Sequence, residues 1–478
     1  MELLLSPEVL AALVIVFYLL AIGSAVEAIL NTRTAQGAIA WVVSLLTLPY
    51  LSVPLYLVFG RNRFEGYLRE RDQIQQLALE RLQHARSKLA DFSAEDIDKA
   101  FYRAFHRLAR QPTVRGNEVS LLVDGYATFA SIERGLLDAQ SSILLQFYIV
   151  RDDALGRRIG KVLMDRARAG VRVHVLYDEI GSARFGRSKL HSQLRDSGVH
   201  LAAFNTTQGR RNRFQLNFRN HRKVVVVDGS YAWIGGHNLG VEYLGEDPKR
   251  GPWRDTHLKI HGPAALGAVL TFATDWLWAR REKLPIEWER DHPSPGDSSV
   301  LIFPSDPASE FEEAGLMYHQ AIIQARERIW ITSPYFVPDR GIVAALQLAA
   351  LRGVDVRVLI PDRPDGPVVG MANWSFTREL LPAGVAVYRY EPAFMHQKVM
   401  LLDRELAGVG TANFDNRSFR LNFEVTALVH DAGFCDQVEA MLERDFAHSR
   451  LVTTEEIEGK PVWFRFAASA ARLMAPVL

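Results

Sequence analysis

The sequence predicts an α/β protein built from two duplicated lobes with pseudo-two-fold symmetry, preceded by a two-helix transmembrane hairpin. Three observations support this prediction. Two apolar segments, each near the roughly 20 residues that span a bilayer, lie within residues 1–60. Strand and helix patterns alternate from residue 119 onward. Finally, one short histidine–lysine motif occurs twice in that region, at His221 and again at His396.

The two apolar segments are residues 9–30 and 38–60. The first is interrupted only by Glu27 and the second contains no charged side chain, so each is long enough to cross the hydrocarbon core. A cleaved signal peptide is an alternative for the first segment, but the start "MELLLSPE" is acidic and lacks a basic region. A buried core helix is a second alternative. Pro49 and Pro54 leave open whether the second segment crosses fully or re-enters.

Basic residues predict the orientation of this hairpin. The loop between the segments contains only Arg33, whereas four arginines follow the second segment. These are Arg61, Arg63, Arg69 and Arg71. Because positive residues stay on the cytoplasmic side, we expect a multi-pass protein of the cell (inner) membrane with residues 61 onward in the cytoplasm.

The remaining chain divides at changes in composition. Residues 61–118 form a charged helical connector, 119–283 the first lobe, 284–300 a Pro- and Ser-containing connection, and 301–478 the second lobe with an amphipathic tail. In the first lobe, a strand at 141–150, a helix at 156–170 and a strand at 171–178 follow one another. In the second, the same order occurs at 326–337, 341–353 and 354–362, which predicts a mainly parallel, helix-covered sheet in each lobe.

The spacing between matching features indicates duplication. Gly170 and Gly353 lie 183 residues apart, and His221 and His396 lie 175 residues apart. Two offsets this similar are typical of one lobe repeated with loops of different length.

Composition excludes some functions. The 478 residues are 48% hydrophobic and 23% charged with a formal net charge of +1, so capture of nucleic acid by bulk charge is not expected. Cys435 is the only cysteine, which excludes an internal disulfide and a cysteine-based metal site and predicts a small buried side chain.

The repeated motif reads H-x-K-x4-D-x6-G-x-x-N in both copies. It comprises His221, Lys223, Asp228 and Asn238 in the first lobe and His396, Lys398, Asp403 and Asn413 in the second. On a strand, residues two apart share a side, so each histidine and its lysine face the same way. One such match alone would describe solvated side chains at a strand end. Two copies at identical spacing favour a functional site.

Two imidazoles and two ammonium groups together suit a phosphodiester anion. Lysine and asparagine stabilise oxygens on which charge develops. One imidazole can attack phosphorus while the other protonates the departing alkoxide. This chemistry needs no metal, and we expect neither a metal nor a cofactor.

These motifs resemble those of bacterial cardiolipin synthases of the phospholipase D superfamily. The resembling stretches are "RNHRKVVVVDG" with "IGGHNLGVEY", "WRDTHLKIHGP", "FMHQKVMLLD", "GTANFDNRSFRLNFEV" and the apolar "AWVVSLLTLPY" and "YLVFGR". The resemblance covers nearly the whole chain. It implies the fold already inferred, with two phospholipase D-like lobes that each carry one copy of the motif.

The resemblance also implies roles for individual residues. His221 and His396 would be the catalytic pair, and Lys223, Lys398, Asn238 and Asn413 would bind phosphate. Asp228 and Asp403 complete the catalytic motifs, mostly by holding their loops. Asp255 and Glu424 would each orient an imidazole, the alternative being solvated surface charges. Asn422 and residues 417–419 would shape the second half-site, and His237 would be a bystander.

The implied reaction joins two phosphatidylglycerol molecules into cardiolipin and releases glycerol through a phosphatidyl-histidine intermediate. We predict His221 as nucleophile and His396 as acid and base, although the residues barely distinguish them. The expected partners are phosphatidylglycerol and cardiolipin in the membrane, with no nucleic acid; no protein partner is predictable.

Alternatives are a hydrolytic phospholipase D, cardiolipin synthesis with phosphatidylethanolamine as co-substrate, a nuclease, and a non-catalytic scaffold. The apolar spans and near-zero charge disfavour the nuclease, and the intact motifs disfavour the scaffold.

Two segments suit a lipid surface. Residues 206–222 combine Arg210, Arg211, Arg213, Arg219 and Arg222 with Phe214 and Phe218. Basic and aromatic residues together favour an anionic headgroup surface, and a solvated loop is the alternative. The tail 462–478 is predicted either to lie in the membrane interface or to pack on the lobes.

Overall fold

The computed structural model describes residues 7–32, 34–60, 87–94, 97, 99–204, 217–285 and 293–475. The chain forms two compact units, Met1–Asp72 with Thr206–Arg219, and Gln73–Asn205 with Asn220–Leu478. Predictions that concern Arg33, the four arginines of 61–71, and Arg210, Arg211, Arg213 and Phe214 lie outside the described residues.

The described residues up to Gly60 of the first unit are mostly helical. They form α1 (Pro7–Asn31), α2 (Ala35–Thr47), α3 (Pro49–Leu55) and a π-helical turn (Tyr56–Gly60). Within the described residues, α1 is the one helix long and apolar enough to cross a membrane. The second predicted span is interrupted at Leu48, whose ψ of 56° leaves the helical region. Pro49 explains the break, since its ring disfavours helical geometry in the preceding residue.

Small side chains form the packed face of α1. Ala21, Ser24, Ala25 and Ala28 are its buried residues, and the three alanines form a cluster with Leu45, Val53 and Tyr56 of the following helices. Small residues let helix backbones approach closely, as in membrane helix pairs. The larger apolar side chains of α1, such as Leu19 and Leu30, are exposed, which suits a lipid environment.

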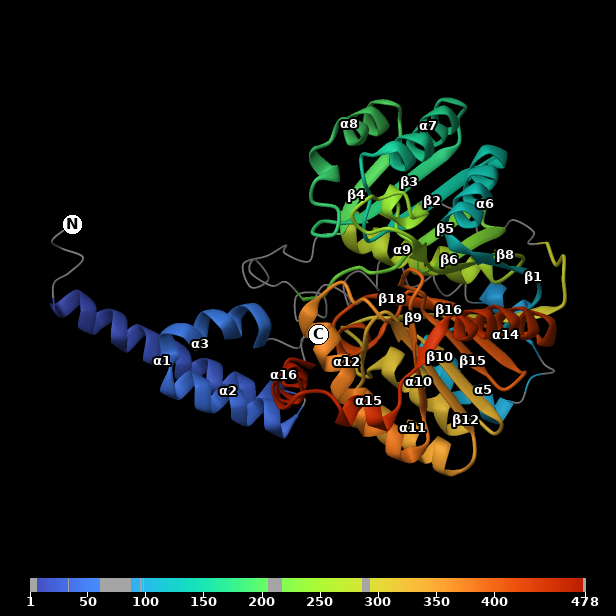
Figure 1. Ribbon diagram of the computed structural model, residues 1–478. Coiled ribbons are helices and arrows are strands. Elements are labelled where there is room, and N and C mark those ends of the chain that lie inside the picture. Colours follow the sequence, from blue (N-terminus) through green and yellow to red (C-terminus); the bar gives the residue numbers. More distant parts are fainter. Residues whose placement is uncertain are drawn as a thin grey trace. The chain divides into compact units, whose positions relative to one another are not determined.

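The second unit contains a 15-stranded sheet among its described residues (Figure 1). Strands from the first half are β1 (Val114–Val123), β2 (Ser142–Phe147), β3 (Arg172–Asp178), β4 (His200–Phe204), β5 (Val224–Val227), β6 (Tyr231–Gly235) and β8 (Thr256–His261). Strands from the second half are β9 (Ser298–Ser305), β10 (Arg328–Thr332), β12 (Asp355–Pro361), β13 (Ala386–Tyr390), β15 (Val399–Leu402), β16 (Leu406–Gly410), β18 (Glu424–His430) and β19 (Ser449–Leu451).

The strand order is the same in both halves. It runs β1-β8-β6-β5-β2-β3-β4 in the first and β9-β18-β16-β15-β10-β12-β13 in the second, with β19 added at the second edge. The halves join through β1 and β9, which pair antiparallel at Val114–Val300 and Asn117–Ser298. An antiparallel pair of equivalent strands is what a two-fold axis through the sheet produces, so the predicted duplication into two lobes is confirmed.

The sheet is mixed rather than mainly parallel, which corrects the sequence prediction. Within the described residues, the strands of this 15-stranded sheet pair in parallel only along β2-β3-β4 and β10-β12-β13. The strand after each lysine instead returns as an antiparallel hairpin, β5–β6 or β15–β16. In the first lobe Asp228 and Gly229 both have positive φ, 51° and 68°, and this geometry makes a tight reversal.

Helices cover both faces of the sheet (Figure 1). In the first lobe α6 (Asp124–Asp138), α7 (Ala154–Arg168) and α8 (Lys189–Asp196) share a core with Ile143 and Leu145 of β2. The alternate residue Gln146 faces α9 (Ala265–Arg280), where its Nε2 donates to Asp275. The equivalents in the second lobe are α10 (Glu313–Gln324), α11 (Arg340–Leu351), α12 (Pro367–Leu380) and α14 (Ala432–Ala447).

The described end of the connector is a core helix of the second lobe. Helix α5 (Lys99–Ala109) buries Tyr102 and Phe105 in the cluster that contains Leu301 and Ile322. Arg103 and Arg107 of α5 are exposed, which is why composition alone suggested a solvated connector. The first sheet strand also begins at Val114, five residues before the predicted lobe boundary.

Candidate active site

Each histidine–lysine pair lies just before the first residue of a buried strand. His221 and Lys223 precede β5, and His396 and Lys398 precede β15. Both lysines are buried, and each Nζ donates to the carbonyl oxygen of its own histidine residue, at 2.6 Å in the first lobe and 2.5 Å in the second. The predicted arrangement of each pair is therefore present: the lysine ammonium is held beside the histidine.

The histidines pair with carboxylates of the opposite lobe. His221 Nδ1 lies 3.0 Å from both carboxylate oxygens of Glu424, and His396 Nδ1 lies 2.8 Å from Asp255 Oδ2. Backbone hydrogen bonds hold the same crossing, since His221 N donates to Phe423 O and His396 N donates to Arg254 O. The structure thus brings the four residues together across the pseudo-two-fold axis.

The pairing determines the tautomer of each ring. A carboxylate only accepts hydrogen bonds, so Nδ1 of both histidines carries the proton. Nε2 is then the nitrogen with a free lone pair in the neutral ring. Both imidazoles are therefore prepared to act through Nε2 as nucleophile or base.

Other side chains hold the two carboxylates. Glu424 accepts from Thr411 Oγ1 at 2.6 Å, from Ser418 Oγ at 2.9 Å and from Asn422 Nδ2 at 3.3 Å. Asp255 accepts from the Thr256 backbone at 2.8 Å. Both carboxylates are 0% exposed, so they are not the solvated surface charges of the alternative interpretation.

Burial controls the charge state of the site. It lowers the pKa of His221 to about 4, although Glu424 opposes the shift. Burial, followed by the two lysines, holds the pKa of His396 well below its usual value. The pKa of Lys398 falls to about 8 through burial, and burial also lowers the pKa of Lys223. Because Lys223 and Lys398 disfavour each other's positive charge, a bound anion would stabilise both.

The two asparagines have different surroundings. Asn238 Oδ1 accepts from the Ile149 backbone at 3.1 Å, and Nδ2 donates to Tyr243 Oη at 2.7 Å. Asn413 donates its backbone N–H to Ser418 Oγ, while its buried Oδ1 has no hydrogen-bond partner among the described residues. The side-chain amide of Asn413 is therefore the less constrained of the two.

The structure does not bring Asp228 and Asp403 to the histidines. They follow the far ends of β5 and β15 at φ of 51° and 49°. Asp228 accepts from the backbone of residues 140–142, and Asp403 accepts from the backbone of residues 326–328. Each carboxylate therefore holds its turn against the start of the neighbouring strand, at the end of the strand opposite the histidine.

A buried polar layer beneath the site was not predicted from the sequence. Arg222, predicted to face a lipid surface, is 3% exposed and pairs with Asp275 at 2.6 Å, which corrects that prediction. At the equivalent place in the second lobe, Gln397 donates to Asp445 at 2.9 Å. The only available signal was position: Arg222 and Gln397 each stand between the histidine and the lysine, so they point to the other side of the strand.

A histidine pair beside Asp255 was not predicted either. The Nδ1 atoms of His237 and His257 lie 3.0 Å apart, and both rings are buried. Burial lowers the pKa of each to about 3, so both are neutral. His237 thus stands next to the site, as predicted, and contacts none of the motif residues directly through a described hydrogen bond.

Comparisons with known proteins agree with this geometry. A family model described as "Cardiolipin synthase, PLD-like domain" matches residues 132–247 and 318–446, which include both histidine motifs. The fold and the crossed histidine–carboxylate site therefore define a phospholipase D-like protein of two lobes. The chain belongs to the cardiolipin synthase family of these proteins.

Individual relatives match the chain from end to end. It is 45% identical over 478 residues to cardiolipin synthase A of Pseudomonas fluorescens and 46% identical over 480 residues to that of Pseudomonas putida, with 99% of each chain covered in both cases. Among solved structures, phosphatidylserine synthase from Haemophilus influenzae aligns with a TM-score of 0.62 at 16% identity. That alignment covers 79% of this chain and 100% of that chain, and it supports the fold alone.

Proposed function

We propose that this cardiolipin synthase transfers a phosphatidyl group from one phosphatidylglycerol to the headgroup hydroxyl of another through a phosphatidyl-histidine intermediate. The observation that carries the proposal is the crossed pairing of His221 with Glu424 and of His396 with Asp255. It leaves two Nε2 atoms, one from each lobe, for the nucleophile and the proton donor. The full-length identity to cardiolipin synthases supports the choice of lipid.

In the first step His221 Nε2 attacks phosphorus. A P–N bond forms, the P–O bond to the glycerol headgroup breaks, and His396 Nε2–H gives its proton to the departing alkoxide. Before substrate binds, the lowered pKa of His396 keeps its imidazole neutral. The negative charge of the bound phosphodiester raises the pKa of the imidazoles and so favours the protonated ring that this step needs.

In the second step the headgroup hydroxyl of another phosphatidylglycerol attacks phosphorus. His396 Nε2 takes the hydroxyl proton, the new P–O bond forms and the P–N bond to His221 breaks. One phosphodiester is exchanged for another, so the overall reaction lies near equilibrium and excess glycerol reverses it. Neither step requires a cofactor or a metal.

Lys223, Lys398, Asn238 and Asn413 form the proposed phosphate clamp. The two ammonium groups neutralise the non-bridging oxygens, on which charge develops in the transition state. Asp228 and Asp403 act structurally in this scheme, because each is already bonded to three consecutive backbone N–H groups.

We further infer that the enzyme works at a membrane with its second unit on the cytoplasmic side. Support comes from α1, which is long and apolar enough to cross a bilayer, and from the arginine excess after residue 60. The broken second segment, α2 and α3, completes a hairpin in this proposal. Its test is whether cysteines placed at positions 34 and 88 react with an impermeant reagent from opposite sides of sealed membrane vesicles. Reaction of both from one side would contradict the hairpin.

The transferase proposal is tested by its products. Labelled phosphatidylglycerol is supplied to the reconstituted enzyme, and cardiolipin, glycerol and phosphatidic acid are counted. We expect equal amounts of cardiolipin and glycerol, and loss of both in His221→Ala and His396→Ala variants. If phosphatidic acid dominates, water is the acceptor and the protein is a hydrolase. Adding phosphatidylethanolamine as the only acceptor tests the alternative co-substrate.

A further inference from the structure

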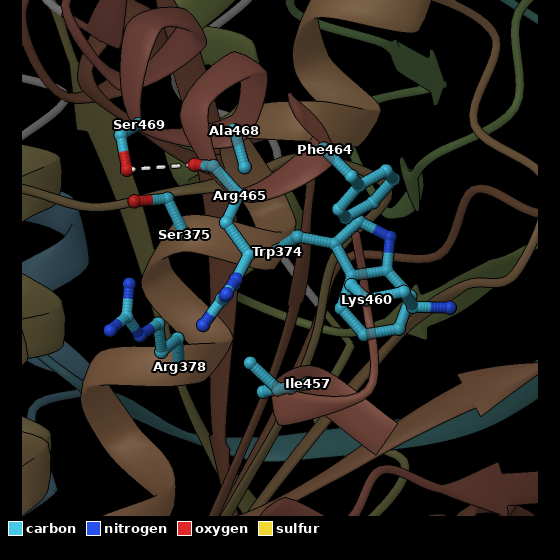
Figure 2. A pocket seen from close by; sticks show the side chains of 9 residues that line it. All are labelled: Trp374, Ser375, Arg378, Ile457, Lys460, Phe464, Arg465, Ala468 and Ser469. Carbon is cyan, nitrogen blue, oxygen red and sulfur yellow. Dashed lines mark hydrogen bonds between the residues drawn. The ribbon is translucent and has the colours of Figure 1, made fainter. Parts of the chain in front are cut away.

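A basic pocket lies between helix α12 and the C-terminal helices, in the second lobe. Figure 2 shows the side chains that line it. They come from α12, from α15 (Thr454–Glu458), from Lys460 and from α16 (Val462–Arg472). The residues that line the pocket are Trp374, Ser375, Arg378, Ile457, Lys460, Phe464, Arg465, Ala468 and Ser469.

Positive charge in this pocket is not balanced locally. The lining contains Arg378, Lys460 and Arg465 and no carboxylate. Lys460 pairs with Glu456 at 3.4 Å. Neither arginine has a carboxylate oxygen within 4 Å in the part of the chain that the structure describes. Two such guanidinium groups beside serine hydroxyls form a suitable site for a phosphate group.

Aromatic packing holds the third cation at the pocket. Lys460 Nζ lies 4.6 Å from the ring centre of Trp374 and 5.6 Å from that of Phe464. Arg389 lies over the Trp374 ring at 4.3 Å and hydrogen-bonds to Asp362. The rings therefore position Lys460 before any ligand arrives, which lowers the entropic cost of binding.

Helix α16 carries apolar side chains on two sides, one packed against the lobe and one exposed to solvent. Its inner face packs on α12, where Trp374 meets Phe464 at 5.9 Å and Arg472 pairs with Glu379 at 2.5 Å. Its outward residues are strongly exposed, Val462 73%, Trp463 66% and Phe466 74%, and so are the two apolar residues just after the helix, Leu473 81% and Met474 49%. Arginines flank this apolar stripe.

We propose that the α12–α16 pocket binds the phosphate of an anionic phospholipid while the outward face of α16 inserts into the membrane interface. The occupant is the anionic bilayer surface itself. Charge complementarity favours it, since arginines without a carboxylate partner border a stripe of tryptophan, phenylalanine and leucine, the composition of interfacial helices. None of the residues that line this pocket belongs to the two histidine motifs, and the lipid it holds is not the one being converted.

The test uses the full chain with a reporter on α16. Because Cys435 is the only cysteine and is buried, a Phe466→Cys variant accepts a single environment-sensitive fluorophore. The labelled protein is placed in nanodiscs of zwitterionic lipid with increasing phosphatidylserine and a lipid-borne quencher. We expect a blue shift and quenching that rise with the anionic fraction. A label at Leu351, an exposed residue of α11, serves as the control and stays unquenched.

Pocket variants separate headgroup binding from apolar insertion. Arg378→Ala/Arg465→Ala weakens the insertion equilibrium by about 30-fold, as expected when two basic side chains are removed near an anionic surface. The double lysine variant, Arg378→Lys/Arg465→Lys, keeps both positive charges and therefore retains most of the insertion seen with the unchanged protein. Arg187→Ala/Arg444→Ala removes two exposed arginines elsewhere and leaves insertion unchanged. Transferase activity in detergent stays within about twofold in all of them, because none lies at the catalytic site.

Three results would overturn the proposal: a label that stays in water in every nanodisc, a label shielded equally in zwitterionic and anionic nanodiscs, or a label already shielded in detergent. The last result would mean that protein, either this chain or a second copy, covers α16. The fluorescence signal is independent of the products formed, so failure of the transferase proposal would leave it interpretable.

Discussion

His221 of the first lobe and Glu424 of the second form a direct hydrogen bond, with Nδ1 3.0 Å from both carboxylate oxygens, although 203 residues separate them in the sequence. The partner pair, Asp255 and His396, repeats the relationship in the opposite direction at 2.8 Å. Neither lobe therefore contains a complete half-site. Each of the two imidazoles is paired with a carboxylate of the other lobe, and the two lobes pack through β1 and β9.

We expect replacement of Glu424 by glutamine to act on catalysis rather than on binding. Glutamine keeps the shape but releases the constraint that places the proton on His221 Nδ1, so kcat falls by about 10²- to 10⁴-fold while KM changes little. Initial rates of cardiolipin formation measure this. Glu443→Gln, an exposed change on α14, is the control. A raised KM at constant kcat would instead place Glu424 in substrate binding.

The two histidines are predicted to differ in a trapping experiment. With labelled phosphatidylglycerol and a rapid alkaline quench, His396→Ala retains a small amount of lipid bound to His221, since the nucleophile remains and the group that completes turnover is missing. His221→Ala retains none. Peptide mapping identifies the modified residue. Label found on His396 in the His221→Ala variant would reverse the assigned roles.

The pH profile of kcat/KM is expected to decline with rising pH between an acid and a basic limb, because His396 is neutral in the free enzyme and must take up a proton before it can act as the acid. Above about pH 8, Lys398 loses its proton and with it the charge that is proposed to bind phosphate, so kcat/KM is expected to fall. On the acid side His221 stays neutral down to about pH 4, so its protonation lowers kcat/KM only there. Lys398→Arg moves the basic limb upward, because arginine keeps its charge. Lys189→Arg, at the surface, does not. If the basic limb stays at the same pH in the Lys398→Arg variant, Lys398 is not the group that sets it.

Asp228 and Asp403 are predicted to affect stability more than chemistry. Replacing either with alanine leaves several backbone N–H groups without their acceptor and lowers the free energy of unfolding by about 2–4 kcal/mol. Replacement by asparagine lowers the free energy of unfolding less, because asparagine tolerates the positive φ of these positions and its side-chain oxygen still accepts a hydrogen bond. Denaturant unfolding in detergent measures the loss, with exposed Asp436→Ala for comparison. A full loss of activity in a protein of normal stability would point to a direct catalytic role.

Much of the candidate site was predictable from local pattern. The strand period of two places each histidine beside its lysine, and the duplicated spacing showed that two such pairs exist. The prediction of Asp255 and Glu424 as orienting groups came from family resemblance, since a single acidic residue in a strand looks the same whether it is solvated or buried. Both carboxylates are buried because each pairs with the histidine of the other lobe. These hydrogen bonds join residues that are far apart in the sequence, by 141 positions for Asp255 and His396 and by 203 positions for His221 and Glu424.

Other features could not be predicted for the same reason. Helix α5 precedes the first lobe but packs in the core of the second, and Arg222 belongs to a basic cluster in sequence but is buried against Asp275. The antiparallel return after each lysine depends on a tight turn at Asp228 and Asp403, where the sequence suggested a parallel sheet.

The sequence by itself determined the features that a short window encodes: the apolar span of α1, the alternation of strands and helices, the duplicated motif and hence the family. Only the tertiary structure decided which carboxylate meets which histidine, which lobe holds α5, and that α16 presents tryptophan and phenylalanine outward beside an unbalanced basic pocket. The physical reason is range. Periodicity and composition act over a few residues, whereas hydrogen-bond partners, burial and charge balance arise between segments that only folding brings together.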